Sequence, residues 1–202
     1  LKAPIASPSF TGAATFSGTV TADGLTTSLG IDVNGTDDLR VRFLNGGSFK
    51  GGAQVATTSG DMITGSAVDD LAIRSQSNML FSTGGATERM RIDASGNVGI
   101  GVAPKAWSVY NAIQIGEGAL AGGEATAYGT SLSSNAYYDG SWKYLTTDEA
   151  AEYKMSNGVH SFRIAASGTA DSAISWITAA TIDNSGRVLI GTDTGDGFNN
   201  DA

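Results

Sequence analysis

The chain has 202 residues, among them 28 glycines, three prolines and no cysteine, and its formal net charge is −8. This acidic balance argues against a nucleic-acid partner or an anionic membrane surface. The absence of any apolar run near the roughly 20 residues that span a bilayer predicts no membrane insertion. The glycine content favours an all-β chain with many turns. Much of the hydrophobic content is alanine, so we expect a thin core that copies of the chain complete.

Residues 1–30 are rich in Thr, Ser, Ala and Gly. Pro4 and Pro8 are incompatible with one continuous helix, and apolar and polar residues alternate in the stretch from Thr15 to Thr21. The sequence therefore predicts an extended, shaft-like β segment over residues 1–30. A disordered linker is the alternative interpretation.

A first β module is predicted over residues 31–104. Short β-prone pieces at 39–43, 71–74 and 79–82 are separated by glycine-rich turns. The module ends in a hairpin in which Asp93 is expected to accept backbone N–H groups of a type I turn, and Gly96 to adopt a positive φ.

The register of this hairpin follows from its turn. If Asp93 pairs with Asn97, Ile92 lies opposite Val98, and the next apolar pair follows two residues further along. Because side chains alternate with a period of two, all of these apolar residues share one face of the predicted sheet.

A second β module is predicted over residues 105–202, with strands at 106–110 and 112–116 and a loose acidic tail. It ends in a repeat of the first hairpin, in which Asp183 and Gly186 have the same spacing. The repeat predicts two weakly related modules.

Two further hairpins are indicated inside the second module. Asp139-Gly140 suits a two-residue type I′ turn, which would place Tyr137 opposite Trp142 and Tyr144 on the same face. The second hairpin has an Asn-Gly turn at residues 157–158, and its register pairs Met155 with His160 and Tyr153 with Phe162.

Three kinds of stretch resemble a known family. The repeated pattern Arg-Ile-Asp-x-Ser-Gly-x-Val-x-Ile-Gly is similar to the motif that recurs in tail fibres and tailspikes of tailed bacteriophages, and residues 3–12 and 135–144 also resemble that family. The stretches cover about a fifth of the chain. The second copy of the pattern departs from the first, since Arg187 stands where Asn97 does.

The resemblance implies an elongated, parallel homotrimeric fibre of short strands and β-hairpins, with a prism-like or interwoven, β-helix-like arrangement. It also implies attachment to a bacterial host and a place in the virion tail fibre, assembled in the host cytoplasm. The partners would be two further copies of the chain and a bacterial surface polysaccharide or outer-membrane receptor. The absence of cysteine fits assembly in a reducing cytoplasm.

Aromatic residues provide the candidate glycan contacts. Tyr and Trp offer flat apolar faces with polar edges, which suit sugar rings, and the candidates are Tyr137, Tyr138, Asp139, Trp142 and Tyr144. The alternative is that one face of this hairpin packs into a subunit core, which would leave Tyr138 and Asp139 at the turn as the accessible contacts.

His160 is the single histidine. A packed residue is the ordinary interpretation of a lone histidine on an apolar face. Three copies meeting on a threefold axis could hold an ion there, although no His-x-His pattern supports a metal site. We expect no bound cofactor.

Glycan depolymerisation by a tailspike is the alternative function, and it would need two carboxyl groups about 5–10 Å apart. Asp148, Glu149 and Glu152 are close in sequence, but we expect them to be solvated, in a loop or in one helical turn capped by Thr147. The leading prediction is therefore a structural and adhesive segment rather than an enzyme. A fragment of a bacterial trimeric surface adhesin is the third possibility.

Overall fold

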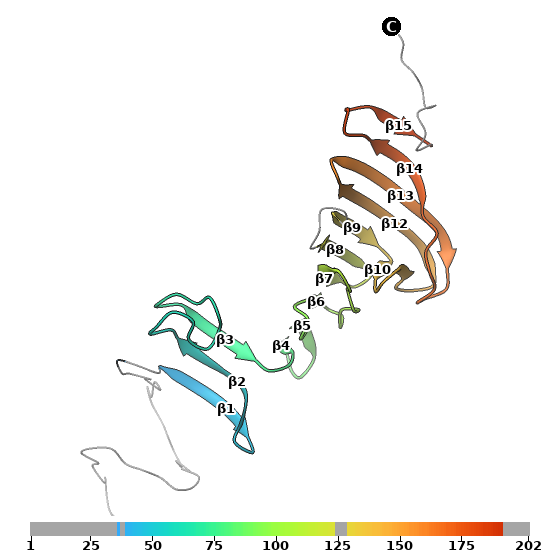
Figure 1. The fold of residues 1–202 in the computed structure, drawn as a ribbon. Coiled ribbons are helices and arrows are strands. Elements are labelled where there is room, and N and C mark those ends of the chain that lie inside the picture. The colour runs from blue at the N-terminus through green and yellow to red at the C-terminus, as the bar shows by residue number, and fades with distance from the viewer. Residues whose placement is uncertain (1–35, 37–38, 124–128, 192–202) are drawn as a thin grey trace, which may run out of the picture.

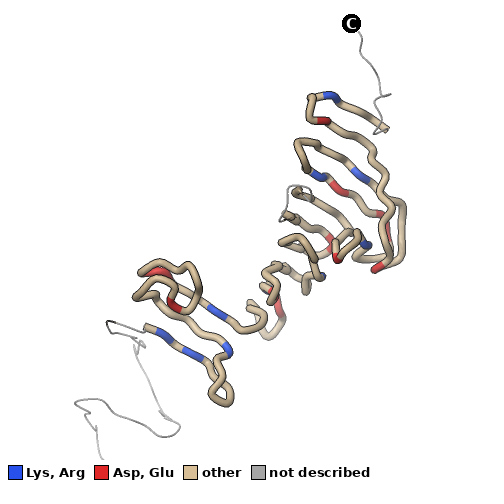
Figure 2. Tube along the Cα trace, in the orientation of Figure 1, with Lys and Arg blue, Asp and Glu red and all other residues tan. Residues whose placement is uncertain are grey.

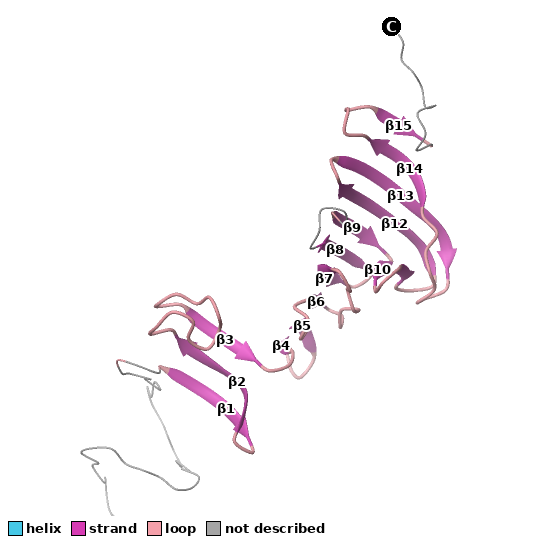
Figure 3. Cartoon of the chain, viewed as in Figure 1, coloured by secondary structure: helices cyan, strands magenta, loops and turns pink. Residues whose placement is uncertain are grey.

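The computed structural model describes residues 36, 39–123 and 129–191. Within those ranges the chain forms fifteen β-strands and no helix, which confirms the all-β prediction (Figure 3). The predicted shaft segment 1–30 and the acidic tail lie outside the described residues.

The strands form two separate sheets and a small hairpin (Figure 1). The first sheet is antiparallel, in the order β1-β2-β3, with bounds β1 (Arg40–Asn45), β2 (Ser48–Val55) and β3 (Leu71–Ser75). Gln54 and Ala72 are buried on one side of it, and Arg74 on that side donates to the carbonyl oxygen of Met62 at 3.2 Å. The other side carries exposed Val41 and Phe43.

Ten strands form the second sheet, in the order β15-β14-β13-β12-β9-β8-β7-β6-β5-β4. Neighbours run antiparallel except for the parallel pair β6–β7. The strands are β4 (Met79–Ser82), β5 (Glu88–Ile92), β6 (Val98–Ile100), β7 (Tyr110–Ile115), β8 (Gly118–Gly123), β9 (Thr130–Ser134), β12 (Asp148–Ser156), β13 (Val159–Gly168), β14 (Ile177–Ile182) and β15 (Val188–Ile190). At about 4.8 Å per strand, the sheet is about 43 Å long across its strands.

A third element, the hairpin of β10 (Ala136–Tyr138) and β11 (Trp142–Tyr144), packs on one face of this sheet, next to β8 and β12. We call that covered side the inner face. In the centre of the sheet most of its residues are small or polar, among them Ala112, Ala119, Ala121, Ser131 and Ser133, and all of these are buried. The large aliphatic side chains of the same strands therefore point the other way, to what we call the outer face.

The two repeated hairpins have the predicted geometry. Ile92 pairs with Val98 in the first, and Ile182 with Val188 in the second. In each, one oxygen of the opening aspartate accepts two backbone N–H groups at 2.8–2.9 Å. The closing glycine has a φ of 89° at Gly96 and 81° at Gly186.

A side chain at either glycine should destabilise the hairpin through backbone strain alone. A Cβ at Gly96 or Gly186 would meet no atom within 4 Å, so the cost of Gly96→Val or Gly186→Val comes from the positive φ. We expect each to lower the free energy of unfolding by about 1–2 kcal/mol or more, measured by denaturant unfolding. Gly122→Ala is the control, because Gly122 also has open space but no positive φ. Equal effects at all three sites would contradict the turn assignment.

The Asn157-Gly158 hairpin also follows the predicted register, since Met155 pairs with His160 and Tyr153 with Phe162. The Asp139-Gly140 register was wrong. Tyr138, rather than Tyr137, pairs with Trp142, because Ser141 joins the turn and makes the loop three residues long.

Two other local predictions are corrected. Residues 148–152 belong to strand β12, which pairs with both β9 and β13, so the loop or helical turn expected after Thr147 is wrong. Residues 106–109 lie outside the strands, with a turn at 108–109, and β7 begins at Tyr110. The ten-stranded sheet includes strands on both sides of residue 104, because β6 pairs with β7. The two sheets are separate between β3 and β4.

Candidate functional site

The outer face of the ten-stranded sheet is the most unusual surface of the described residues. Strand pairing places its side chains in three parallel rows that run across the strands. The middle row has one residue from every strand: Met79, Ile92, Val98, Ile113, Leu120, Leu132, Tyr153, Phe162, Ala180 and Ile190. A continuous apolar line therefore crosses the whole sheet.

The middle row is flanked on both sides. The first row is Phe81, Met90, Ile100, Ile115, Gly118, Ser134, Ala151, Ile164 and Ile177. The third row is Asn111, Gly122, Thr130, Met155, His160, Ile182 and Val188. Neither row, nor the middle row, contains Asp, Glu, Lys or Arg. The charged residues that Figure 2 marks on these strands lie outside the three rows.

Large apolar side chains on this face are open to solvent. Leu132 is 58% exposed, Ile115 60% and Ile190 66%. Scattered exposed hydrophobic residues are normal, but a contiguous apolar surface across ten strands is typical of an interaction site. Its estimated area, about 43 Å by about 17 Å, is close to the roughly 800 Å² that each partner buries in a standard interface.

His160 lies in the third row of this face. Its Nδ1 is 2.5 Å from the hydroxyl of Tyr153, and the two rings stack with centroids 5.9 Å apart. Tyr153 stacks in turn on Phe162, at 4.8 Å. His160 is thus held by an aromatic ladder, and no group of three or more His, Cys, Asp or Glu residues in the described ranges is arranged to hold a metal ion.

The predicted glycan contacts separate into buried and accessible residues. Tyr137 and Tyr144 are buried, and their hydroxyl groups donate to Asp171 at 2.7 Å and to the carbonyl of Ala166 at 2.6 Å. Burial, followed by the bond to Asp171, raises the pKa of the Tyr137 hydroxyl. These two side chains serve the core, as the alternative interpretation expected.

The remaining candidates are more exposed, although Tyr138 and Trp142 also pack against the buried cluster that contains Trp107 and Tyr110. Tyr138 and Trp142 are partly exposed, and their rings meet edge to face with centroids 5.6 Å apart. Asp139 is exposed and accepts from the ammonium group of Lys143 at 2.9 Å. Trp176, which the sequence did not single out, extends this aromatic group through Trp142 at 6.0 Å.

Glu152 lies in a buried charged group that sequence reasoning missed. Its side chain is 0% exposed, it forms an ion pair with Arg163, and it accepts from the Ser131 hydroxyl. The Arg163 guanidinium lies 5.0 Å from the Trp176 ring centroid and 5.9 Å from that of Trp142. The expectation that Glu152 is solvated was therefore wrong. Side chains alternate between the two faces of a strand, so the position of Glu152 in β12 was the signal that could have shown this.

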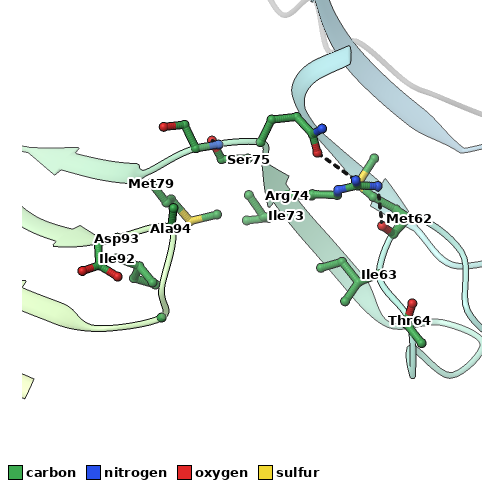
Figure 4. A pocket seen from close by; sticks show the side chains of 13 residues that line it. Met62, Ile63, Thr64, Ile73, Arg74, Ser75, Met79, Ile92, Asp93 and Ala94 are labelled. Atoms are coloured by element: carbon green, nitrogen blue, oxygen red, sulfur yellow. Dashed lines mark hydrogen bonds between the residues drawn. The ribbon is translucent and has the colours of Figure 1, made fainter. Parts of the chain in front are cut away.

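A cleft of about 610 Å³ lies where the first sheet meets the first repeated hairpin (Figure 4). Ile63 and Ile73 line it from one side, and Met79 and Ile92 line it from the other. The cleft therefore continues the middle row of the outer face toward the first sheet. Asp93 is the single acidic residue among its lining residues, and one oxygen of its carboxylate already accepts the turn N–H groups.

The hydrogen bonds of two aspartates lead us to expect that the folded protein is less stable in acid. Hydrogen bonds from Lys105 and then Tyr137 lower the pKa of Asp171, and the backbone and side chain of Arg187 lower that of Asp183. A depressed folded-state pKa contributes stability above the ordinary value of 3.8, which is lost as pH falls through the folded-state pKa. We expect thermal melts to show a falling midpoint below about pH 4. The double variant Asp171→Asn/Asp183→Asn should show a shallower fall, and an unchanged slope would contradict the assignment.

Comparison with known proteins adds no family assignment. No protein-family model matches the chain, and no curated protein is significantly similar to it. None of the described residues belongs to a helix long and apolar enough to cross a membrane.

Proposed function

We propose that this chain is a structural and adhesive segment of a homotrimeric bacteriophage tail fibre that attaches to glycans on the surface of a bacterial host. The observation that carries the proposal is the outer face of the ten-stranded sheet. Its large side chains are exposed while alanine and serine are buried beneath β10 and β11. Covering the outer face with other copies of the chain removes that apolar surface from water.

The resemblance of the repeated hairpins and of residues 135–144 to tail-fibre sequences supports the viral assignment. Both hairpins have the strand register and the positive-φ glycine that the repeated pattern predicted. In the proposal, attachment is polyvalent, because each copy presents the same weak glycan contacts and several contacts held together bind far more strongly than one.

The accessible aromatic residues are the proposed glycan contacts. Tyr138 and Trp142 are partly exposed in the hairpin of β10 and β11, where they also pack against the buried cluster around Trp107 and Tyr110, and exposed Asp139 lies at the turn between them. Association through the outer face leaves this hairpin free. The proposal assigns no catalytic step to the chain.

Binding of the labelled protein to purified capsule and lipopolysaccharide preparations tests this function. We expect retention by at least one preparation, and at least a tenfold weaker retention of Trp142→Ala and of Tyr138→Ala, because stacking on an aromatic ring contributes most of such a contact. Lys50→Ala, on the first sheet, is the control. Release of oligosaccharides during incubation would favour the depolymerase instead, and retention by no preparation would contradict the adhesive assignment.

A further inference from the structure

Lys154 lies on the inner face of the ten-stranded sheet and is partly exposed there. It follows Glu152 by two positions on β12, so both side chains point to the same face. Strand pairing places Ser131 of β9 on one side of Lys154 and Ser161 of β13 on the other. A long basic side chain therefore stands among small hydroxyl residues.

The ammonium group of Lys154 is not compensated. In the part of the chain that the structure describes, no hydrogen bond or ion pair holds it. The charges nearest to it belong to Arg163 and Glu152, which already pair with each other, so the three side chains together carry one excess positive charge. Burial, and next the charge of Arg163, lower the pKa of Lys154. A charged lysine at this position therefore costs folding free energy.

The aromatic residues of the inner face adjoin this cation. The Arg163 guanidinium lies under the rings of Trp142 and Trp176, and the pair of Glu152 with Arg163 is followed on the same face by Lys154 with Ser161. The Nε of Arg163 and the Nε1 of Trp176 are buried donors without an acceptor. The aromatic side chains and the lysine thus lie side by side, in a region that is short of hydrogen-bond acceptors.

We propose that Lys154 binds the acidic group of an anionic glycan, a carboxylate or a phosphate, while a neighbouring sugar ring of the same glycan contacts Trp142. This inference rests on the proposed glycan attachment and names the class of glycan. The acidic group supplies both the acceptor oxygens and the negative charge that the lysine lacks, and hydrogen bonds between charged partners are the strong ones. Asp139 does not oppose it, because Lys143 already pairs with that carboxylate.

The unpaired charge also selects against other ligands. A neutral glycan would cover the ammonium group without pairing it, and burying an unpaired charge is costly. The chain as a whole has a net charge of −8, so its general field repels anions rather than attracting them. Retention of an acidic glycan therefore reports a local site.

Chemical removal of the acidic groups tests the inference on a capsule or lipopolysaccharide preparation that retains the protein. One arm reduces carboxylates to alcohols with carbodiimide and borohydride, and the other removes phosphate with cold aqueous hydrofluoric acid. We expect one of these treatments to weaken retention of the unmodified protein at least tenfold. Lys154→Met should weaken retention by the untreated preparation by a similar factor and should lose nothing further after that treatment, because both changes remove the same contact.

Two variants control for charge and for folding. Lys50→Met removes an exposed lysine from the first sheet and should bind like the unmodified chain. Lys154→Arg keeps the charge and should retain most of the binding. Melting of each variant checks the fold, and Lys154→Met should melt no lower than the unmodified protein, because the charge that it removes has no partner.

The outcomes separate this inference from the proposed function. Equal retention of Lys154→Met and the unmodified protein, or equal retention by treated and untreated preparations, would overturn the inference. If Trp142→Ala still loses retention in that case, the glycan attachment stands without an acidic subsite. Retention of the unmodified protein by no preparation would contradict the attachment and the inference together.

Discussion

Replacing Leu132 with Asp should convert the proposed trimer into monomers. Leu132 lies at the centre of the middle row and is 58% exposed in the isolated chain. The substitution should therefore change the folding stability of the isolated chain only slightly. In the assembly, burial of the leucine contributes about 2 kcal/mol per chain. An unpaired, buried carboxylate in its place costs at least several kcal/mol more in each of the three chains. Sedimentation or light scattering measures the effect.

Ser167→Asp provides the matched control, because it adds the same charge at an exposed position of β13 outside the three rows. It should assemble like the unmodified chain. If Leu132→Asp assembles equally well, the outer face is not the interface between copies. If both variants dissociate, net charge rather than the outer face controls assembly.

Replacing Glu152 with Gln should cause the largest loss of folding stability within one chain, about 3–5 kcal/mol. The substitution keeps the shape of the side chain but removes the charge that compensates Arg163 beneath Trp142 and Trp176. A guanidinium that is only 18% exposed is strongly unfavourable without its carboxylate, whereas exchanging both partners for apolar residues is often neutral. The free energy of unfolding from a denaturant titration gives the value.

Two further variants show whether the ion pair is responsible. Glu149→Gln, an exposed position on the same strand, should change stability by no more than about 0.5 kcal/mol. The double variant Glu152→Leu/Arg163→Met should recover most of the loss seen in Glu152→Gln. A double variant as unstable as the single one would indicate that the site depends on packing rather than on paired charge.

Local turn chemistry was the part of the fold that the sequence predicted well. Asp93 and Gly96 define their hairpin within a few residues, and the alternation of side chains then fixes the register of the flanking strands. The Asn157-Gly158 turn allowed the same reasoning. Such predictions succeed because every interaction they use is local.

Errors arose where distant segments decide the local structure. Asp139-Gly140 satisfies a two-residue turn by composition, yet the loop takes in Ser141 and brings Trp142 opposite Tyr138. With that pairing, Trp142 packs against Tyr110 and Trp176 from other parts of the chain. A single-sequence pattern has no information about those contacts.

The outer face could be predicted only in part. The apolar side of each repeated hairpin was evident, but its extension over ten strands depends on the parallel pairing of β6 with β7, which no hairpin signal indicates. Likewise, Glu152 was assigned to solvent because its neighbours in sequence are charged. Its neighbours in space are Ser131 and Arg163, from strands on either side.

The native mass of the purified protein tests the central claim most directly. We expect light scattering to give three times the chain mass of 20.5 kDa, unchanged on dilution into the low micromolar range. A mass of one chain, with the protein folded and soluble, would mean that the outer face needs no second copy and would contradict the account.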